Sequence, residues 1–178
     1  MKKPIPMIGI SAFSGTGKTT LLKQIIPLLK ARDLRIAVLK HAHHEFEVDI
    51  PGKDSYELRK SGADQTIIST ATRMADIREF KRPEDELSLD QIVASLDADK
   101  IDLILVEGYK SARFSKIELN REALGHPFLH TDDPMIIALA CDHPQPPTTE
   151  IPILDLNNID MIADFIYQDF YLANTPGI

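Results

Sequence analysis

A strand, a glycine-containing loop and a helix near the N-terminus constrain this chain more than any other stretch. Residues 8–22 read Ile-Gly-Ile-Ser-Ala-Phe-Ser-Gly-Thr-Gly-Lys-Thr-Thr-Leu-Leu. The apolar run over residues 7–10 predicts a buried strand, and apolar residues at helical spacing predict a helix over residues 18–32. A strand, Gly-x-Gly-Lys-Thr and a helix, in that order, form the setting that a phosphate-binding loop requires. The stretch therefore predicts an α/β protein that binds a nucleotide.

The residue types in this loop suit a polyphosphate chemically. Successive backbone N–H groups and the helix N-terminus supply hydrogen-bond donors to phosphate oxygens. Gly15 and Gly17 let the backbone approach the phosphates without a Cβ in the way. Lys18 is predicted to reach the β- and γ-phosphates, and the Thr19 hydroxyl is predicted to coordinate Mg²⁺. Ala12 stands where the general pattern has its first glycine, and we expect its small side chain to let the loop close.

Length and charge narrow the classes of function. The 178 residues fit one domain with a sizeable core, which we place at residues 1–172, followed by a disordered tail over residues 173–178. The formal net charge of −7 argues against non-specific binding to nucleic acid or to an anionic membrane. No apolar run approaches the length of a membrane span, the N-terminus lacks the apolar core of a signal peptide, and Cys141 has no second cysteine to pair with. These features predict a soluble, cytoplasmic protein.

The rest of the chain alternates short apolar runs with helical patterns. Strands are predicted at residues 36–39, 66–69, 74–77, 101–106, 116–119 and 135–140, and helices at residues 55–61 and after Ser88 and Asn158. The weak alternation over residues 116–119 favours an edge strand. A strand–helix–strand unit so near the N-terminus implies a right-handed crossover and a parallel sheet. The predicted fold is a three-layer α/β fold of the P-loop NTPase type, with a mostly parallel sheet and antiparallel edge strands.

Three acidic residues lie in segments that follow predicted strands, where a parallel sheet places its ligands. Glu107 follows five apolar residues, and we predict that it holds Mg²⁺ together with Thr19. Asp49, in the loop after the strand at residues 36–39, is the second candidate for the metal's shell. A carboxylate at Asp142 could accept the N1–H and N2–H of guanine. No Asn-Lys-x-Asp stretch supports that role, and an Asp opening an Asp-His-Pro turn explains the residue equally well.

The histidines after the second predicted strand leave one alternative open. His41, His43 and His44 could ligate Zn²⁺ or Ni²⁺ in a metal-insertion GTPase. A complete ligand set is not evident, and solvent-exposed loop histidines explain the pattern more simply.

A small-molecule kinase is the other alternative. Such an enzyme usually has a mobile lid with several arginines over the phosphates, and the only arginine cluster, Arg73, Arg78 and Arg82, carries no mark of a lid. The sequence also offers no evident cis arginine for hydrolysis, which favours a switch or an adapter over a metabolic catalyst.

Four stretches carry a resemblance to a known family. They are Phe13-Ser-Gly-Thr-Gly-Lys-Thr-Thr-Leu-Leu22, Leu39-Lys-His-Ala-His-His44, Val48-Asp-Ile-Pro-Gly-Lys-Asp-Ser-Tyr-Glu-Leu-Arg59 with Gly62-Ala63, and Leu103-Ile-Leu-Val-Glu-Gly-Tyr-Lys110. With these stretches the chain resembles the molybdopterin-guanine dinucleotide biosynthesis adapter family, MobB. The phosphate loop alone is unspecific, whereas Pro-Gly-Lys-Asp-Ser together with Val-Glu-Gly-Tyr-Lys is much more specific. A related class of dimeric ATPases places a second lysine at the position of Phe13, whose ring argues against that class.

This resemblance implies a GTP-binding homodimer with slow Mg²⁺-dependent GTPase activity at most. It would act beside the molybdopterin guanylyltransferase that attaches GMP to molybdopterin. The implied cofactors are GTP and Mg²⁺, and molybdopterin or its molybdenum form is a further implied partner. The residues implied for nucleotide binding are Ser14, Gly15, Thr16, Gly17, Lys18, Thr19, Thr20 and Asp142. Thr19, Asp49 and Glu107 would attend the metal, and Lys18 and Glu107 would be the catalytic residues.

Overall fold

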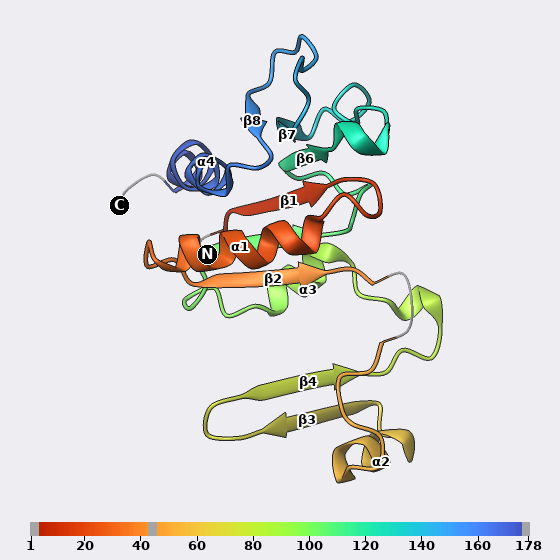
Figure 1. The fold of residues 1–178 in the computed structure, drawn as a ribbon. Helices are drawn as coiled ribbons and strands as arrows, with labels where there is room; N and C mark the ends of the chain where they lie inside the picture. The colour runs from red at the N-terminus through yellow and green to blue at the C-terminus, as the bar shows by residue number, and fades with distance from the viewer. Residues whose placement is uncertain (1–3, 43–45, 176–178) are drawn as a thin grey trace. The chain divides into compact units, whose positions relative to one another are not determined.

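The computed structural model describes residues 4–42 and 46–175, and its main element is a six-stranded sheet (Figure 1). The strands run in the order β2-β5-β1-β6-β7-β8, and every neighbouring pair is parallel. Their bounds are Met7–Ser11 for β1, Ile36–Lys40 for β2, Leu103–Glu107 for β5, Lys116–Asn120 for β6, Ile136–Cys141 for β7 and Ile153–Asp155 for β8. The predicted α/β fold with a mostly parallel sheet is confirmed.

Helices that pack on this sheet close its main core. α1 (Lys18–Lys30) follows the loop after β1, and α4 (Ile159–Asp164) continues into the π-helical segment η3 (Phe165–Tyr171). Ile25 of α1 and Ile162 of α4 are fully buried in one cluster with apolar residues of the strands. This packing fixes β1 and α1, and with them the loop that joins the two elements.

The polar residues of β6 face a loop rather than solvent. Lys116, Glu118 and Asn120 alternate along the strand, and all three are buried. Lys116 donates a hydrogen bond to Asp133 at 2.9 Å, and Asn120 donates to the carbonyl of residue 126 at 3.2 Å. Glu118 accepts hydrogen bonds from the backbone N–H groups of residues 129 and 130 at 2.7 and 2.9 Å. The predicted edge strand is therefore wrong, because β6 lies between β1 and β7 and its polar side chains find partners within the protein.

The described chain divides into two compact units. Unit 1 comprises the residues up to 41 and from 96 onward, and unit 2 comprises residues 42–95. Unit 2 holds the antiparallel hairpin of β3 (Gln65–Ser69) and β4 (Met74–Arg78), with the helices α2 (Asp54–Lys60) and α3 (Leu89–Ser95). The two antiparallel strands form a sheet of their own, so they are not edge strands of the parallel sheet. The region expected to be one domain therefore contains two units.

Unit 2 contains a buried arginine with three carboxylate partners. The Arg59 guanidinium, on α2, donates to Asp49 at 2.7 Å and also donates to Glu47 and Glu79. The side chains of Arg59 and Asp49 are each only 5% exposed. The hydrogen bond from Arg59 holds the pKa of Asp49 below its ordinary value, although burial of the carboxyl opposes this effect. These contacts tie the segment before α2 and the residue after β4 to the helix.

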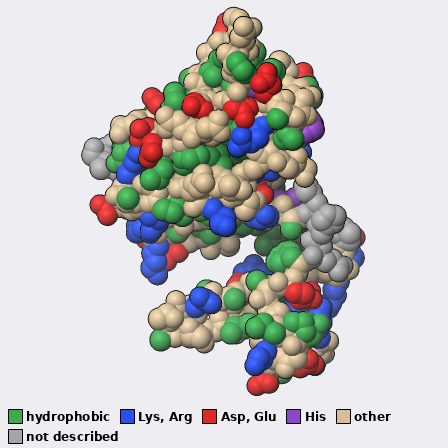
Figure 2. Space-filling view, viewed as in Figure 1, with side chains coloured by type: hydrophobic (Ala, Val, Ile, Leu, Met, Phe, Trp, Pro, Cys, Tyr) green, Lys and Arg blue, Asp and Glu red, His purple; other side chains and the backbone are tan. Residues whose placement is uncertain are grey.

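Large apolar side chains are exposed on unit 2. Figure 2 shows hydrophobic side chains at its surface, in the lower part of the view. The exposed fractions range from 61% to 72% for the residues Phe46, Val48, Ile50, Leu58, Ile67 and Met74. Exposed apolar surface of this kind marks sites of interaction when it is extensive.

The last described residues form the 3-10 turn η4 (Leu172–Asn174). Thr175 is buried, and its hydroxyl donates to the Tyr171 carbonyl at 2.8 Å. The tail predicted to be disordered from residue 173 is thus packed as far as residue 175, and residues 176–178 lie outside the described part. Throughout residues 4–42 and 46–175, no helix has the length and apolar character needed to cross a membrane.

Candidate functional site

The phosphate loop lies at the carboxyl edge of the parallel sheet. Because all six strands run in the same direction, the residues that follow them meet at one edge. Residues 12–17 connect β1 to α1 at this edge. Lys40, Glu107, Arg121 and Asp142 stand at or directly after the ends of β2, β5, β6 and β7. Since β1 lies between β5 and β6, the loop has Glu107 on one side and Arg121 on the other.

Two glycines shape the loop. Gly15 and Gly17 have φ angles of 80° and 105°, a backbone conformation that favours glycine. An added Cβ at either position would meet no other atom within 4 Å, so the backbone angle and not crowding requires glycine there. Thr16 is buried between them, and its hydroxyl donates to the Phe13 carbonyl at 3.0 Å. The loop forms this turn with Ala12 in place of a first glycine.

Lys18 folds back over the loop. Its ammonium donates to the Ala12 and Phe13 carbonyls, both at 3.0 Å. Burial lowers the pKa of Lys18, and the positive charge of Lys110 lowers this pKa further, while Glu107 opposes the change. A partly desolvated ammonium at a helix N-terminus is well placed to bind phosphate oxygens. The two remaining predicted residues, Ser14 in the loop and Thr20 in the first turn of α1, are exposed.

Thr19 and Glu107 form the part of the site that fits a magnesium ion. The Thr19 hydroxyl lies 3.1 Å from both carboxylate oxygens of Glu107, although the two residues are 88 positions apart. Lys40 Nζ lies 3.3 Å from Glu107 Oε1. A hydroxyl and a carboxylate are hard oxygen donors, and one or two such ligands beside substrate phosphates are usual for Mg²⁺. Within the part of the chain that the structure describes, no group of three or more His, Cys, Asp or Glu side chains forms a metal site.

Asp142 is joined to the phosphate loop through Arg121. Asp142 Oδ2 accepts a hydrogen bond from Arg121 Nη1 at 2.9 Å, and Oδ1 accepts one from the Glu122 N–H at 2.9 Å. The Nε of the same arginine donates to the Thr16 carbonyl in the loop at 3.1 Å. Sequence reasoning missed Arg121, because the strand before it was interpreted as an edge strand and its carboxyl end was not considered. Its position directly after Asn120, the last residue of β6, was the signal that could have identified it.

The ring of Phe13 contacts two other segments of the chain. His126 stacks on this ring with the centroids 4.4 Å apart and the planes inclined by 21°. The Lys110 ammonium lies 5.9 Å from the same centroid, near the limit for a cation–π contact. The segments that follow β5 and β6 therefore both reach the phosphate loop at residue 13.

The remaining residues that the sequence suggests as metal ligands are Asp49 and three histidines, and they do not all lie in one unit. Asp49 belongs to that unit, where Arg59 donates to both of its carboxylate oxygens, and its role in the metal's shell stays a prediction. The His41 N–H donates to the Glu107 carbonyl at 2.9 Å. His43 and His44 lie outside the described residues, so the transition-metal alternative is not tested.

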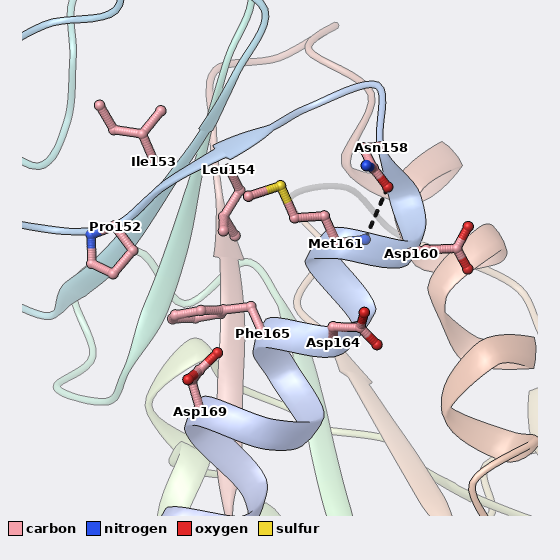
Figure 3. A pocket seen from close by; sticks show the side chains of 9 residues that line it. All are labelled: Pro152, Ile153, Leu154, Asn158, Asp160, Met161, Asp164, Phe165 and Asp169. Carbon is pink, nitrogen blue, oxygen red and sulfur yellow. Dashed lines mark hydrogen bonds between the residues drawn. The ribbon is translucent and has the colours of Figure 1, made fainter.

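A cavity of about 570 Å³ lies elsewhere in unit 1, beside β8 and α4 (Figure 3). Its lining residues are Pro152, Ile153, Leu154, Asn158, Asp160, Met161, Asp164, Phe165 and Asp169. The Asn158 side chain accepts a hydrogen bond from the Met161 N–H at 3.0 Å and caps α4, as the sequence predicts. None of the lining residues belongs to the phosphate loop or to the ends of β1, β5 and β6, so the cavity is distinct from the candidate nucleotide site.

Comparison with known proteins identifies the family. A family model described as molybdopterin guanine dinucleotide synthesis protein B, MobB, matches residues 7–142. The chain is 46% identical over 168 residues to the molybdopterin-guanine dinucleotide biosynthesis adapter protein of Escherichia coli (strain K12), with 94% of each chain covered. It is 40% identical over 166 residues to the adapter protein of Haemophilus influenzae, with 93% of this chain and 90% of that protein covered. A crystal structure of molybdopterin-guanine biosynthesis protein B matches with a TM-score of 0.69 and 26% identity, and the match covers 90% of this chain and 97% of that one. The chain belongs to the MobB family of molybdopterin guanine dinucleotide synthesis proteins.

Proposed function

We propose that this chain is a GTP-binding adapter in the biosynthesis of molybdopterin guanine dinucleotide. Its relatives at 46% and 40% identity carry that adapter name and are matched over nearly their whole length. The observation that supports nucleotide binding is the convergence of Lys18, Thr19 and Glu107 at the loop between β1 and α1. The adapter acts beside a molybdopterin guanylyltransferase, with molybdopterin or its molybdenum form as a further ligand of the complex.

In this proposal the loop binds the phosphates and Lys18 changes partners. Its ammonium exchanges the Ala12 and Phe13 carbonyls for β- and γ-phosphate oxygens, which carry more negative charge than a carbonyl. Thr19 and Glu107 would hold Mg²⁺, which would supply positive charge opposite the phosphates. Lys18 and Glu107 are then the residues of a slow GTPase, with a rate on the order of 10⁻³ s⁻¹ or less.

We propose that the carboxylate of Asp142 recognises guanine. Each of its carboxylate oxygens already accepts one hydrogen bond, from Arg121 or from the Glu122 N–H. A carboxylate has about four lone-pair sites, so it can accept the N1–H and N2–H of guanine in addition. Adenine offers no donor pair at these positions. The shared carboxylate would also connect base binding to Arg121 and through it to the Thr16 carbonyl.

A titration with two nucleotides tests this function. Calorimetry in Mg²⁺ measures the affinity of the wild type, Asp142→Asn and Asp160→Asn for GTP and for ATP. Asn keeps an acceptor for the Glu122 N–H but replaces one acceptor for guanine by a donor. We expect the wild type and Asp160→Asn, which changes a carboxylate on α4, to prefer GTP and Asp142→Asn to lose that preference. Equal affinity for both nucleotides in the wild type would remove the guanine assignment and favour the kinase alternative.

The adapter role requires a second measurement. We expect the purified chain to increase the formation of molybdopterin guanine dinucleotide by a guanylyltransferase, and Lys18→Ala to increase it less. An assay in which the wild type and Lys18→Ala have the same effect would separate the adapter role from nucleotide binding. No observation favours the kinase, because Arg78 and Arg82 pair with neighbouring carboxylates of unit 2.

The adapter is also proposed to be a homodimer. Unit 2 exposes large apolar side chains, among them Ile67 and Met74 on its hairpin. β2 is an edge strand of the parallel sheet, and its Val38 is 47% exposed. Both features support a contact with a second protein surface.

A further inference from the structure

The ammonium of Lys110 lies beside the phosphate loop. Lys110 follows β5 by three residues, and its Nζ is 5.9 Å from the ring centroid of Phe13. Among residues 4–42 and 46–175, no carboxylate forms an ion pair with Lys110, whereas Lys40 pairs with Glu107 at 3.3 Å. The Lys18 ammonium is itself bonded to the Phe13 carbonyl at 3.0 Å. Two positive groups therefore converge on residue 13.

The backbone after β5 turns Lys110 towards the loop. Gly108 and Tyr109 have φ angles of 100° and 51°, so two successive residues adopt the left-handed region. Tyr109 has a Cβ and holds this conformation under strain, which is found most often where a functional geometry demands it. The Lys110 carbonyl accepts a hydrogen bond from Lys116 Nζ at 3.1 Å, and the Lys116 side chain is only 3% exposed. The main chain at residue 110 is therefore anchored by a buried group.

Converging like charges favour a ligand of the opposite charge. The ammonium groups of Lys110 and Lys18 both lie at Phe13, one at its ring and one at its carbonyl, and like charges that converge on one residue repel one another. The nearby carboxylate of Glu107 is already engaged by Thr19 and Lys40. A polyphosphate at the loop would bring several negative charges to this place and relieve the repulsion.

We propose that Lys110 contacts the terminal phosphate of the bound nucleoside triphosphate. Glu107, which with Thr19 would hold the metal beside the phosphates, ends β5, and Lys110 follows it at the same strand end. The ring of Phe13 supports this ammonium at a loop position that has no positive charge of its own. Lys18 then serves the β- and γ-phosphates, and Lys110 serves the γ-phosphate alone. The inference rests on the proposed binding of a nucleotide and adds the group that distinguishes triphosphate from diphosphate.

The test compares GTP with GDP. Calorimetry in Mg²⁺ measures both affinities for the wild type, Lys110→Ala and Lys23→Ala, which removes the same charge from an exposed site on α1. We expect Lys110→Ala to weaken GTP binding by about tenfold or more, because a charge-assisted hydrogen bond is lost. GDP binding should change by less than about twofold, as expected for a distant surface charge. Lys23→Ala should leave both affinities unchanged, and thermal unfolding should show that all three proteins are folded.

The outcomes separate this inference from the proposed function. If Lys110→Ala weakens GTP and GDP equally, or behaves like Lys23→Ala, Lys110 does not read the terminal phosphate and nucleotide binding stands. If the wild type binds neither nucleotide, the proposed function fails and the role of Lys110 fails with it. Lys110→Arg keeps the positive charge and should recover most of the preference for GTP. An arginine variant that binds GTP as weakly as Lys110→Ala would overturn the assignment.

Discussion

The Lys18 ammonium holds two carbonyls of its own loop, both at 3.0 Å. Because these are its hydrogen-bond partners among the described residues, we expect Lys18→Ala to keep the fold and to lose nucleotide affinity. Two charge-assisted hydrogen bonds to phosphate are worth about a hundredfold or more in affinity. Calorimetry with GTP measures this loss, and a thermal unfolding midpoint close to that of the wild type shows that the fold is retained. Unchanged GTP affinity in Lys18→Ala would remove the interpretation of residues 12–19 as a phosphate loop.

Gly108 combines a left-handed backbone with a close approach to His41, so a larger residue there should destabilise the fold. Its φ angle is 100°, and an added Cβ would lie 2.9 Å from the Cβ of His41. We expect Gly108→Ala to lower the free energy of unfolding by about 2 kcal/mol or more, because backbone strain and a steric clash add. Gly125→Ala is the matched control, since Gly125 has a φ angle of 61° and open space around the added Cβ. This control should cost about 1 kcal/mol from the backbone angle alone. If urea unfolding gives the same decrease in the free energy of unfolding for both variants, His41 moves aside and the predicted clash adds no cost.

Secondary-structure elements were predictable wherever their determinants are local in sequence. The strand, loop and helix from residue 7 to residue 30 follow from apolar spacing and the Gly-Lys-Thr stretch. The helix predicted after Ser88 is likewise confirmed, and Ser88 and Gln91 cap it through hydrogen bonds of 2.9 and 3.3 Å. Strand β6 was misjudged because Glu118 is polar, and its partners lie 11 and 12 residues further on. The same error hid Arg121, so the predicted site had Asp142 without the residue that connects it to the loop.

The ion pair between Arg59 and Asp49 makes the stability of unit 2 depend on pH in the acid range. Arg59 lowers the pKa of Asp49 in folded unit 2 relative to its unfolded value of about 3.9. A carboxyl with a lowered folded pKa contributes stability above about pH 4, and that stability is lost as the pH falls through the lower folded value. We expect the amide protection factors of β3 and β4, corrected for intrinsic exchange, to decrease over this acid range.

The variant Arg59→Met reverses the sign of this pH dependence. Without the guanidinium, burial of Asp49 and repulsion from the nearby carboxylates of Glu47 and Glu79 raise the pKa of Asp49 above its unfolded value. Protonation then relieves repulsion, so acidification should increase the protection of β3 and β4 in this variant. If the protection factors of Arg59→Met and the wild type decrease equally on acidification, a group other than Asp49 causes the loss of stability at low pH.

The whole molecule has a small unit that exposes apolar surface and a larger unit that carries the phosphate loop. A two-stranded hairpin is marginally stable by itself in water. Ile67 and Met74 lie on one face of the β3–β4 hairpin, with exposed fractions of 61% and 70%. Burying one such side chain contributes about 1.5–3 kcal/mol, so covering several of them would offset the weakness of the hairpin. A second copy of the chain, as the homodimer proposal requires, would supply that cover.

Sedimentation velocity of the intact protein over a range of concentrations tests whether a second copy of the chain covers the hairpin face. We expect the wild type to sediment as a dimer, and the double variant Ile67→Ser with Met74→Ser to shift towards monomer, because it removes apolar area from the exposed hairpin face without adding charge. Leu124→Ser, which changes an apolar side chain that is 41% exposed in unit 1, is the matched control and should remain dimeric. A wild type that stays monomeric at every concentration would contradict the homodimer. A dimer that survives the double variant would place the interface on another surface, for which the open edge of β2 with Val38 is the next candidate.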